Sequence, residues 1–206
     1  MKPARAENVA KLLVIACGAL SKEILWLKKH HKWLPIDLQC IDAALHNKPD
    51  EIPRQLKSKI ALNRDKYEYI FVAYADCGTG GDIDRLIAEE GIQRLPGAHC
   101  YSFYAGEAEF MTMSEDEPGT FYLTDFLVEH FERIVIKGLG LNRYPDLYEQ
   151  YFGNYRRLMY LSQIRDQRLV SMAEQAAQFL GLDFEHRHCG FGDLKAALET
   201  QVLRLL

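Results

Sequence analysis

The sequence lacks any hydrophobic run that approaches the roughly 20 apolar residues of a membrane-spanning helix. It also lacks a cluster of lysine or arginine residues, and its 25 basic and 29 acidic residues give a net charge of −4. Nucleic-acid binding and electrostatic anchoring to a membrane both depend on clustered positive charge. We therefore expect neither nucleic acid nor a membrane as a partner, and a small molecule as the substrate.

Cysteine is present, but without the arrangements that most often make it structural. The number of cysteines is odd and no two form a C-x-x-C pair, which argues against a zinc knuckle and a thioredoxin motif. The apolar stretch before Cys17, residues 12–16, is shorter than the roughly 7 to 15 residues of a signal-peptide core. We therefore expect reduced thiols in a cytoplasmic protein. The cysteines are Cys17, Cys40, Cys77, Cys100 and Cys189.

Strand-like and helix-like segments alternate along most of the chain. This alternation predicts an α/β fold, with an open, mostly parallel, doubly wound (Rossmann-like) sheet of about five to six strands. We expect a single domain over residues 1–206, with a helical insertion at about residues 107–154. The predicted strands are residues 11–17, 36–41, 67–74, 99–104, 156–161 and 184–189, and the predicted helices are residues 21–31, 48–62, 82–90, 120–141, 144–155, 167–180 and 193–205.

An aromatic stripe runs through the predicted insertion. Such a stripe at helical spacing more often packs against a core than lines a substrate pocket, and we keep the pocket as the alternative. The stripe comprises Tyr144, Tyr148, Tyr151, Phe152 and Tyr155.

Cysteine and histidine side chains follow successive predicted strands. Cys17 ends the first strand, His46 follows the second, and Cys77 follows the third; Cys100 lies in the fourth. Open α/β sheets bind ligands at the carboxyl ends of their strands, so these side chains could face one crevice. Zinc takes thiolate sulfur and imidazole nitrogen, and other thiophilic ions or an iron–sulfur cluster also suit thiolates. From spacing alone, the favoured interpretation is that the cysteines are small buried hydrophobic residues.

Glu23 lies in the first turn of the first predicted helix, close to that crevice. It could be a further ligand or a proton acceptor there. The favoured interpretation is an exposed glutamate that complements the helix dipole.

Residues 77–81 (CGTGG) form a glycine-rich stretch between a strand and a helix. Free N–H groups at this position can bind an anion, and Gly78, Gly80 and Gly81 would then contact a cofactor. The stretch lacks the spacing of a dinucleotide fingerprint and the lysine of a P-loop. A tight turn that requires positive φ angles is therefore the favoured interpretation.

Two histidine pairs are weaker candidates. His99 adjoins Cys100, and their side chains would point to opposite faces of a strand. His186 and His188 alternate and could share one face of a strand, although a polar edge strand is the commoner case.

Several short motifs, in the same order, resemble a bacterial and archaeal family catalogued as domain of unknown function 1638. These motifs are IACGALSKEI, AALHNKPDEI, FVAYADCGTGG, HCYSFYAG, FYLTDF, YRRLMYLSQ, AAQFLGL and GFGDLKAAL, which span nearly the whole chain. Ala75 departs from the YG-x-CG form that is more frequent in the family, and it leaves the following cysteine in place.

The resemblance implies a context and a set of residues, and no activity. Such proteins are often encoded beside corrinoid-dependent methyltransferases and corrinoid proteins, which implies one-carbon or methylated-compound metabolism. The family's motifs centre on the residues that here are Cys17, Glu23, His46, Cys77 and Cys100.

The leading hypothesis is a metal-binding protein with a zinc–thiolate site that activates a thiol or polarises a small substrate, as in alkyl transfer. Its ligands would be Cys17, Cys77, Cys100 and His46, with Glu23 as a further ligand or proton acceptor. One alternative is a non-catalytic partner or metal carrier for a corrinoid methyltransferase system, which docks through the tyrosine-rich insertion. The other is a metal-free enzyme with Cys77 as nucleophile and His46 or His99 as base.

Overall fold

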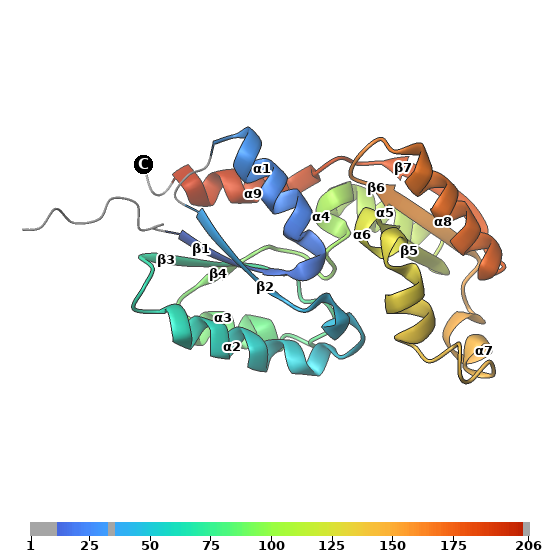
Figure 1. Cartoon of the computed structure of the whole chain (residues 1–206), viewed down its shortest axis with the longest axis horizontal. Helices are drawn as coiled ribbons and strands as arrows, with labels where there is room; N and C mark the ends of the chain where they lie inside the picture. Colours follow the sequence, from blue (N-terminus) through green and yellow to red (C-terminus); the bar gives the residue numbers. More distant parts are fainter. Residues whose placement is uncertain (1–11, 33–35, 204–206) are drawn as a thin grey trace, which may run out of the picture. The chain divides into compact units, whose positions relative to one another are not determined.

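A computed structural model of the chain describes residues 12–32 and 36–203 (Figure 1). The predicted α/β class with parallel strands is confirmed. The strands are divided between two sheets, and the chain forms two compact units. Unit 1 comprises the described residues up to Pro96 and from Lys195 onward, and unit 2 comprises Gly97–Leu194. Among the described residues, no helix combines the length and the apolar character that crossing a bilayer would require.

The sheet of unit 1 is parallel throughout, and its strand order reverses at β1. The chain passes from β1 to β2 on one side and then returns past β1 to β3 on the other, which makes the carboxyl end of β1 and β3 a topological switch point. The order is β2-β1-β3-β4, with β1 at Leu12–Cys17, β2 at Ile36–Ile41, β3 at Tyr69–Ala73 and β4 at Gln93–Arg94.

Helices cover both faces of this sheet, as the continuous apolar sequence of β1 requires. Leu12–Ala16 are all buried, so each face of β1 contacts a helical layer. Figure 1 shows α1 (Ser21–His30) and α9 (Gly192–Leu203) on one face, with α2 (Ile52–Asn63) and α3 (Asp82–Glu90) on the other. Lys11 and Leu205, the outer ends of a predicted strand and a predicted helix, lie outside the described residues.

Unit 2 is built on a second parallel sheet, in the order β5-β6-β7, with β5 at Thr120–Thr124, β6 at Arg157–Ser162 and β7 at Asp183–His188. Its core packs β5 and β6 against α8 (Gln167–Phe179), through Leu123 and Leu158 on the strands and Ala173 on the helix. The remaining helices are α4 (Ser102–Ala105), α5 (Glu107–Asp116), α6 (Asp125–Glu129), a π-helix (Glu132–Lys137) and α7 (Leu147–Phe152).

Two local predictions are wrong. Residues 120–124 form β5, not the start of a helix, because they pair with β6 along their whole length and the helix begins only at Asp125. Residues 99–104 form a turn and α4, not a strand. The backbone N–H and the hydroxyl of Ser102 both donate to the His99 carbonyl, which closes the turn. The fourth strand is instead β4, whose two residues are too few to give an apolar pattern.

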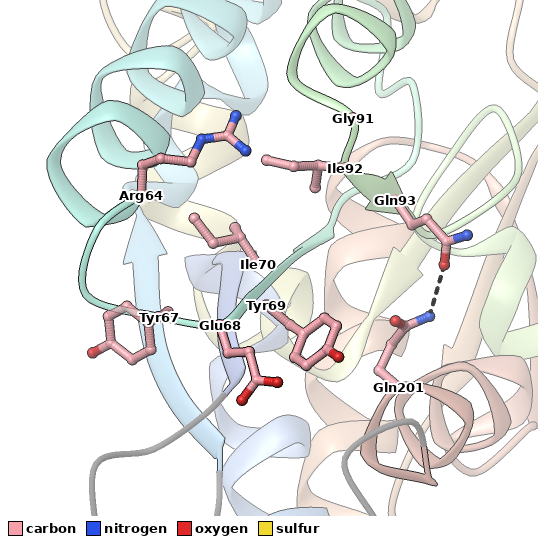
Figure 2. A pocket seen from close by; sticks show the side chains of 9 residues that line it. All are labelled: Arg64, Tyr67, Glu68, Tyr69, Ile70, Gly91, Ile92, Gln93 and Gln201. Atoms are coloured by element: carbon pink, nitrogen blue, oxygen red, sulfur yellow. Dashed lines mark hydrogen bonds between the residues drawn. The ribbon is translucent and has the colours of Figure 1, made fainter.

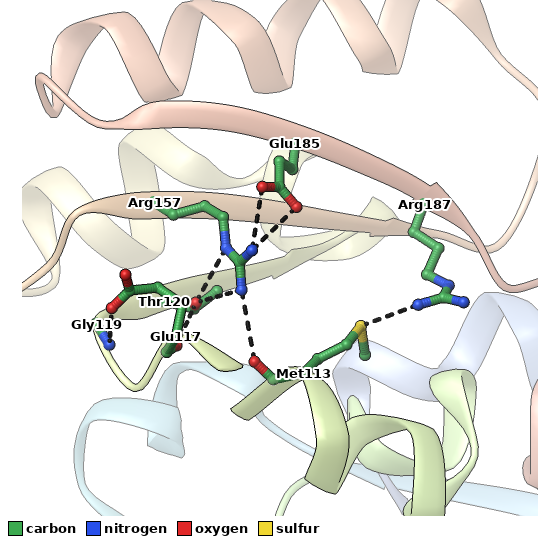
Figure 3. Close-up of polar contacts among 7 residues, drawn as sticks. All are labelled: Met113, Glu117, Gly119, Thr120, Arg157, Glu185 and Arg187. Atoms are coloured by element: carbon green, nitrogen blue, oxygen red, sulfur yellow. Dashed lines mark hydrogen bonds and ion pairs between the residues drawn. The ribbon is translucent and has the colours of Figure 1, made fainter. Parts of the chain in front are cut away.

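Polar contacts at the amino ends of the strands stabilise the fold and lie away from the edge where ligands bind. In unit 1 a small cavity of about 180 Å³ lies beside the starts of β3 and β4, where Gln93 and Gln201 are hydrogen-bonded at 3.2 Å (Figure 2). In unit 2 the Arg157 guanidinium, at the start of β6, donates to both Glu185 carboxylate oxygens at 3.0 and 3.1 Å and to the Thr120 hydroxyl at 3.0 Å (Figure 3). Arg157 thereby joins the starts of all three strands of its sheet.

Candidate functional site

Two cysteines meet at the switch point of unit 1. Cys17 is the last residue of β1, and Cys77 lies in the loop that follows β3, the neighbouring strand. The two thiols interact electrostatically with each other and with Tyr74, which belongs to the same buried cluster. The structure therefore brings Cys17 and Cys77 together, as predicted from their positions after adjacent strands.

The turn after Cys17 is tightly packed at Gly18. A Cβ atom on Gly18 would lie 3.1 Å from the Ile41 carbonyl oxygen and 3.3 Å from the Ala43 nitrogen. The end of β1 therefore approaches the end of β2 so closely that a side chain here would force the neighbouring backbone to shift by a few tenths of an ångström. This close approach fixes the position of Cys17 at the carboxyl edge of the sheet.

The loop after β3 is the tight turn that the glycine-rich stretch predicts. Gly78, Gly80 and Gly81 have φ angles of 82°, 63° and 84°, in the left-handed region that glycine adopts without strain. Cys77 shares this region, with φ of 51°, although it carries a Cβ atom. A non-glycine residue held there costs free energy, and such strain often occurs at functional sites.

Asp76 organises this loop from within. Its carboxylate accepts hydrogen bonds from the Thr79 hydroxyl at 2.7 Å, the Gly81 N–H at 2.8 Å and the Gly80 N–H at 3.2 Å. Burial acts to raise the pKa of Asp76, but these hydrogen bonds outweigh it and the pKa lies below its ordinary value. Two N–H groups that could contact a bound anion are thus already satisfied by a carboxylate. A role of Gly78, Gly80 and Gly81 in cofactor binding stays a prediction.

Burial makes Cys17 and Tyr74 harder to ionise than an exposed cysteine or tyrosine. It raises the pKa of the Cys17 thiol to about 11, against the lowering effects of the Ala19 N–H and the Tyr74 hydroxyl. Burial, followed by the Cys17 thiol, also raises the pKa of Tyr74. The Tyr74 hydroxyl lies beside this thiol and forms no hydrogen bond of normal geometry within the described residues. A bound cation would ionise a thiol in such surroundings.

Arg94, which the sequence analysis missed, adds a positive charge to this edge. Its guanidinium donates to the two Asp84 carboxylate oxygens at 2.6 and 2.8 Å, and it interacts electrostatically with Cys77. A guanidinium favours the thiolate form of a nearby cysteine. Arg94 follows from no sequence signal because it ends a strand of two residues.

The other predicted site residues lie on other elements of the two units. His46 is exposed on a 3-10 helix (Ala43–Asn47) that follows β2. Glu23 is buried in the first turn of α1, so the exposed interpretation is wrong. Cys100 is buried in unit 2, and the structure does not determine how the two units are placed. Residues 12–32 and 36–203 contain no group of three or more His, Cys, Asp or Glu side chains that could hold a metal ion.

The aromatic stripe of unit 2 mainly packs, as the favoured interpretation predicts. Phe152 is buried, and Tyr148 and Tyr155 pack against the same core. Tyr144 and Tyr151 are exposed.

Comparison with known families gives one match. Residues 40–198 match the family model described as "Protein of unknown function (DUF1638)". No curated protein and no solved structure matches the chain.

Proposed function

The chain belongs to the DUF1638 family, and because that description assigns no activity, we propose one from the residues themselves. Cys17 and Cys77 bind a thiophilic metal ion, for which zinc is the leading candidate. The metal ion acts on a small methylated or alkylated substrate. The pathway is cytoplasmic one-carbon metabolism that is linked to corrinoid proteins. The observation that carries this proposal is the meeting of two thiols at the topological switch point of a parallel sheet.

The two thiols supply half of a zinc site. Zinc in proteins takes about four ligands, and a catalytic site leaves one position for water or substrate. His46 remains the proposed additional protein ligand and Glu23 the proposed proton acceptor, and a ligand role of Cys100 stays a prediction. A zinc ion bound here would lower the pKa of a substrate thiol or polarise a substrate oxygen.

The surroundings of the pair suit a cation more than an anion. The Cys17 thiol is buried and protonated at neutral pH, so it becomes a thiolate only when a positive charge compensates the cost of burial. The Tyr74 hydroxyl, buried beside it, can donate a hydrogen bond to the thiolate and so stabilise the metal-bound form. The N–H groups of Gly80 and Gly81, which could bind an anion, already donate to the Asp76 carboxylate.

Elemental analysis of protein purified without a metal-affinity tag tests the proposal. We expect about one zinc or other thiophilic ion per chain, lost in Cys17→Ser and Cys77→Ser and retained in Cys40→Ser and Cys189→Ser. The control Cys40 is exposed on β2, and its electrostatic effect on the Cys17 thiol is smaller than that of Cys77. The control Cys189 lies in unit 2.

Unchanged metal content in Cys77→Ser, in protein whose circular dichroism spectrum matches that of the native chain, would reject the ligand assignment. Absence of metal after incubation with zinc would reject the metal altogether.

A metal-free enzyme with Cys77 as nucleophile is the second candidate, and the interaction of Arg94 with Cys77 favours it. It predicts rapid alkylation of Cys77 in metal-free protein, slowed at least about tenfold in Arg94→Gln because the positive charge that favours the thiolate is lost. If neither metal nor a reactive thiol is found, the non-catalytic partner of a corrinoid system remains, and capture of a purified corrinoid protein tests it.

A further inference from the structure

A second pocket lies at the carboxyl edge of the sheet in unit 2. It has a volume of about 320 Å³, and its lining includes Ser162 at the end of β6, and His186 and His188 on β7. The loop after β6 and the start of α8 complete it, with Arg165 and Asp166 among its residues. This is the edge at which open parallel sheets bind ligands.

The two histidines converge on one hydroxyl group. Ser162 Oγ lies 2.9 Å from His186 Nε2 and 3.1 Å from His188 Nδ1, which confirms that the two histidines share a face of the strand. A serine hydroxyl has a single hydrogen, so it donates to one imidazole and accepts from the other. The three side chains therefore form a hydrogen-bonded chain in which the two rings have opposite roles.

A buried carboxylate holds this chain in place. The His186 ring stacks on Tyr160, with centroids 5.0 Å apart, and the Tyr160 hydroxyl donates to Asp125 at 2.7 Å. Asp125 also accepts the N–H groups of Gln163 and Ile164, each at 3.0 Å. Because these two N–H groups are engaged, they cannot stabilise the oxyanion that forms on a substrate carbonyl when a serine attacks it. The loop therefore supports binding more than nucleophilic attack by the serine.

The chargeable groups of the pocket favour a negatively charged ligand. Arg165 lines it and acts electrostatically on His186. Burial and the neighbouring His188 lower the pKa of His186, which makes it a neutral hydrogen-bonding group at pH 7. The carboxylate of Asp166 takes no part in the hydrogen-bonded chain of Ser162 and the two histidines. It accepts the Arg168 N–H at 2.8 Å and lies 3.4 Å from the Arg168 guanidinium.

We propose that this pocket binds a small anionic metabolite through its carboxylate or phosphate group. Arg165 provides the opposite charge, and the His186–Ser162–His188 chain provides hydrogen bonds whose directions adjust to the ligand. Its volume lies at the small end of the range for ligand pockets, roughly 300 to 1,000 Å³. The proposal uses no residue of unit 1 and is independent of the thiol pair.

NMR titration of the histidine ring protons in the full chain tests this proposal, with inorganic phosphate and acetate as separate probes at constant ionic strength. His186→Gln and His188→Gln assign the two signals. We expect saturable shifts of both signals with at least one probe, and the probe that binds more tightly identifies the ligand group. Arg165→Gln should weaken binding at least about tenfold, the effect of losing a charge-assisted hydrogen bond.

The matched control is Arg156→Gln, which removes an exposed arginine of unit 2 beside the amino end of β6 and should leave the affinity unchanged. The proposal is overturned if neither probe gives a saturable shift, or if Arg165→Gln and Arg156→Gln have equal effects.

Discussion

The carboxyl edges of the two sheets carry different kinds of side chains, thiols in unit 1 and hydrogen-bonded polar groups in unit 2. In unit 1 the edge presents two thiols and a buried tyrosine with few hydrogen bonds, beside a loop in which Cys77 has a positive φ angle. In unit 2 the edge presents a serine and two histidines in a continuous hydrogen-bonded network. Parallel topology thus determines where a site can form, and the few residues after each strand determine what it can bind.

Burial shifts the pKa of one group at each edge by the same physical effect, but in opposite directions. It raises the pKa of Cys17 and lowers the pKa of His186, because removal from water disfavours whichever form is charged. Burial therefore favours the uncharged form of both groups. We assign a cation to the first edge and an anion to the second, and variants at each edge separate the two.

The largest expected effect is on the polar edge. Asp125→Ala leaves three donors without their acceptor, those of Tyr160, Gln163 and Ile164, and should lower the free energy of unfolding by about 4 kcal/mol. Hydrogen exchange of the β6 amides measures the loss within unit 2. Asp166→Ala is the control, since it removes a helix cap and should cost about 1 kcal/mol. A loss for Asp125→Ala no greater than for this control would contradict the role of the carboxylate.

The next effect is on the reactivity of Cys17. In metal-free protein at pH 8, iodoacetamide should alkylate this thiol about a hundredfold more slowly than a cysteine with the ordinary pKa of 9.0, because its pKa is about 11. The rate should rise about tenfold per pH unit up to about pH 11, followed by mass spectrometry. The same residue in a short peptide is the control. A rate that levels off near pH 9 would show that steric protection, not burial of charge, slows the reaction.

A smaller effect concerns the loop beside the thiols. Asp76→Asn weakens the acceptor of three hydrogen bonds and should lower the free energy of unfolding by about 2 kcal/mol at pH 7. The folded-state pKa of Asp76 is below its ordinary value of 3.8, so this stability is present above that value and is lost as pH falls through the folded pKa. Urea unfolding at pH 7 and pH 3 should therefore show the two chains converging at the lower pH. A constant difference across this range would contradict the assignment.

The smallest effect has the opposite sign. Cys77→Gly should stabilise the chain by about 1 kcal/mol, because glycine adopts the φ angle of 51° without strain. Cys77→Ala removes the same thiol while keeping the Cβ atom and is the matched control. Equal stability of the two variants in urea would show that the loop holds Cys77 without strain.

The sequence predicts elements well where the signal is local. A buried apolar run marks β1, and Ile36–Ile41 and Asp82–Glu90 match their predicted bounds because flanking turns or capping residues delimit them. The division into two sheets has no local signal, since strand pairing joins residues far apart in the chain. The strand β4 is missed for a related reason, because two residues show no periodicity.

The candidate site is predictable only in part. The positions of Cys17 and Cys77 follow from the ends of their strands, and Cys100 is assigned to the fourth strand only because residues 99–104 are mistaken for one. The acceptor role of Asp76 and the approach of Arg94 to Cys77 depend on how loops pack, which no spacing in the sequence reveals.

The return of the chain to unit 1 has a consequence for synthesis on the ribosome. The helix α9 carries buried Leu198 and Val202, and it is tied to unit 1 by contacts of Gln201 with Gln93 and of Glu199 with His31. All of unit 2 emerges before this helix, a delay of roughly 5 to 20 seconds at ordinary translation rates. Unit 1 therefore spends that interval with one face of its sheet incompletely covered, and its apolar side chains there are accessible to a chaperone.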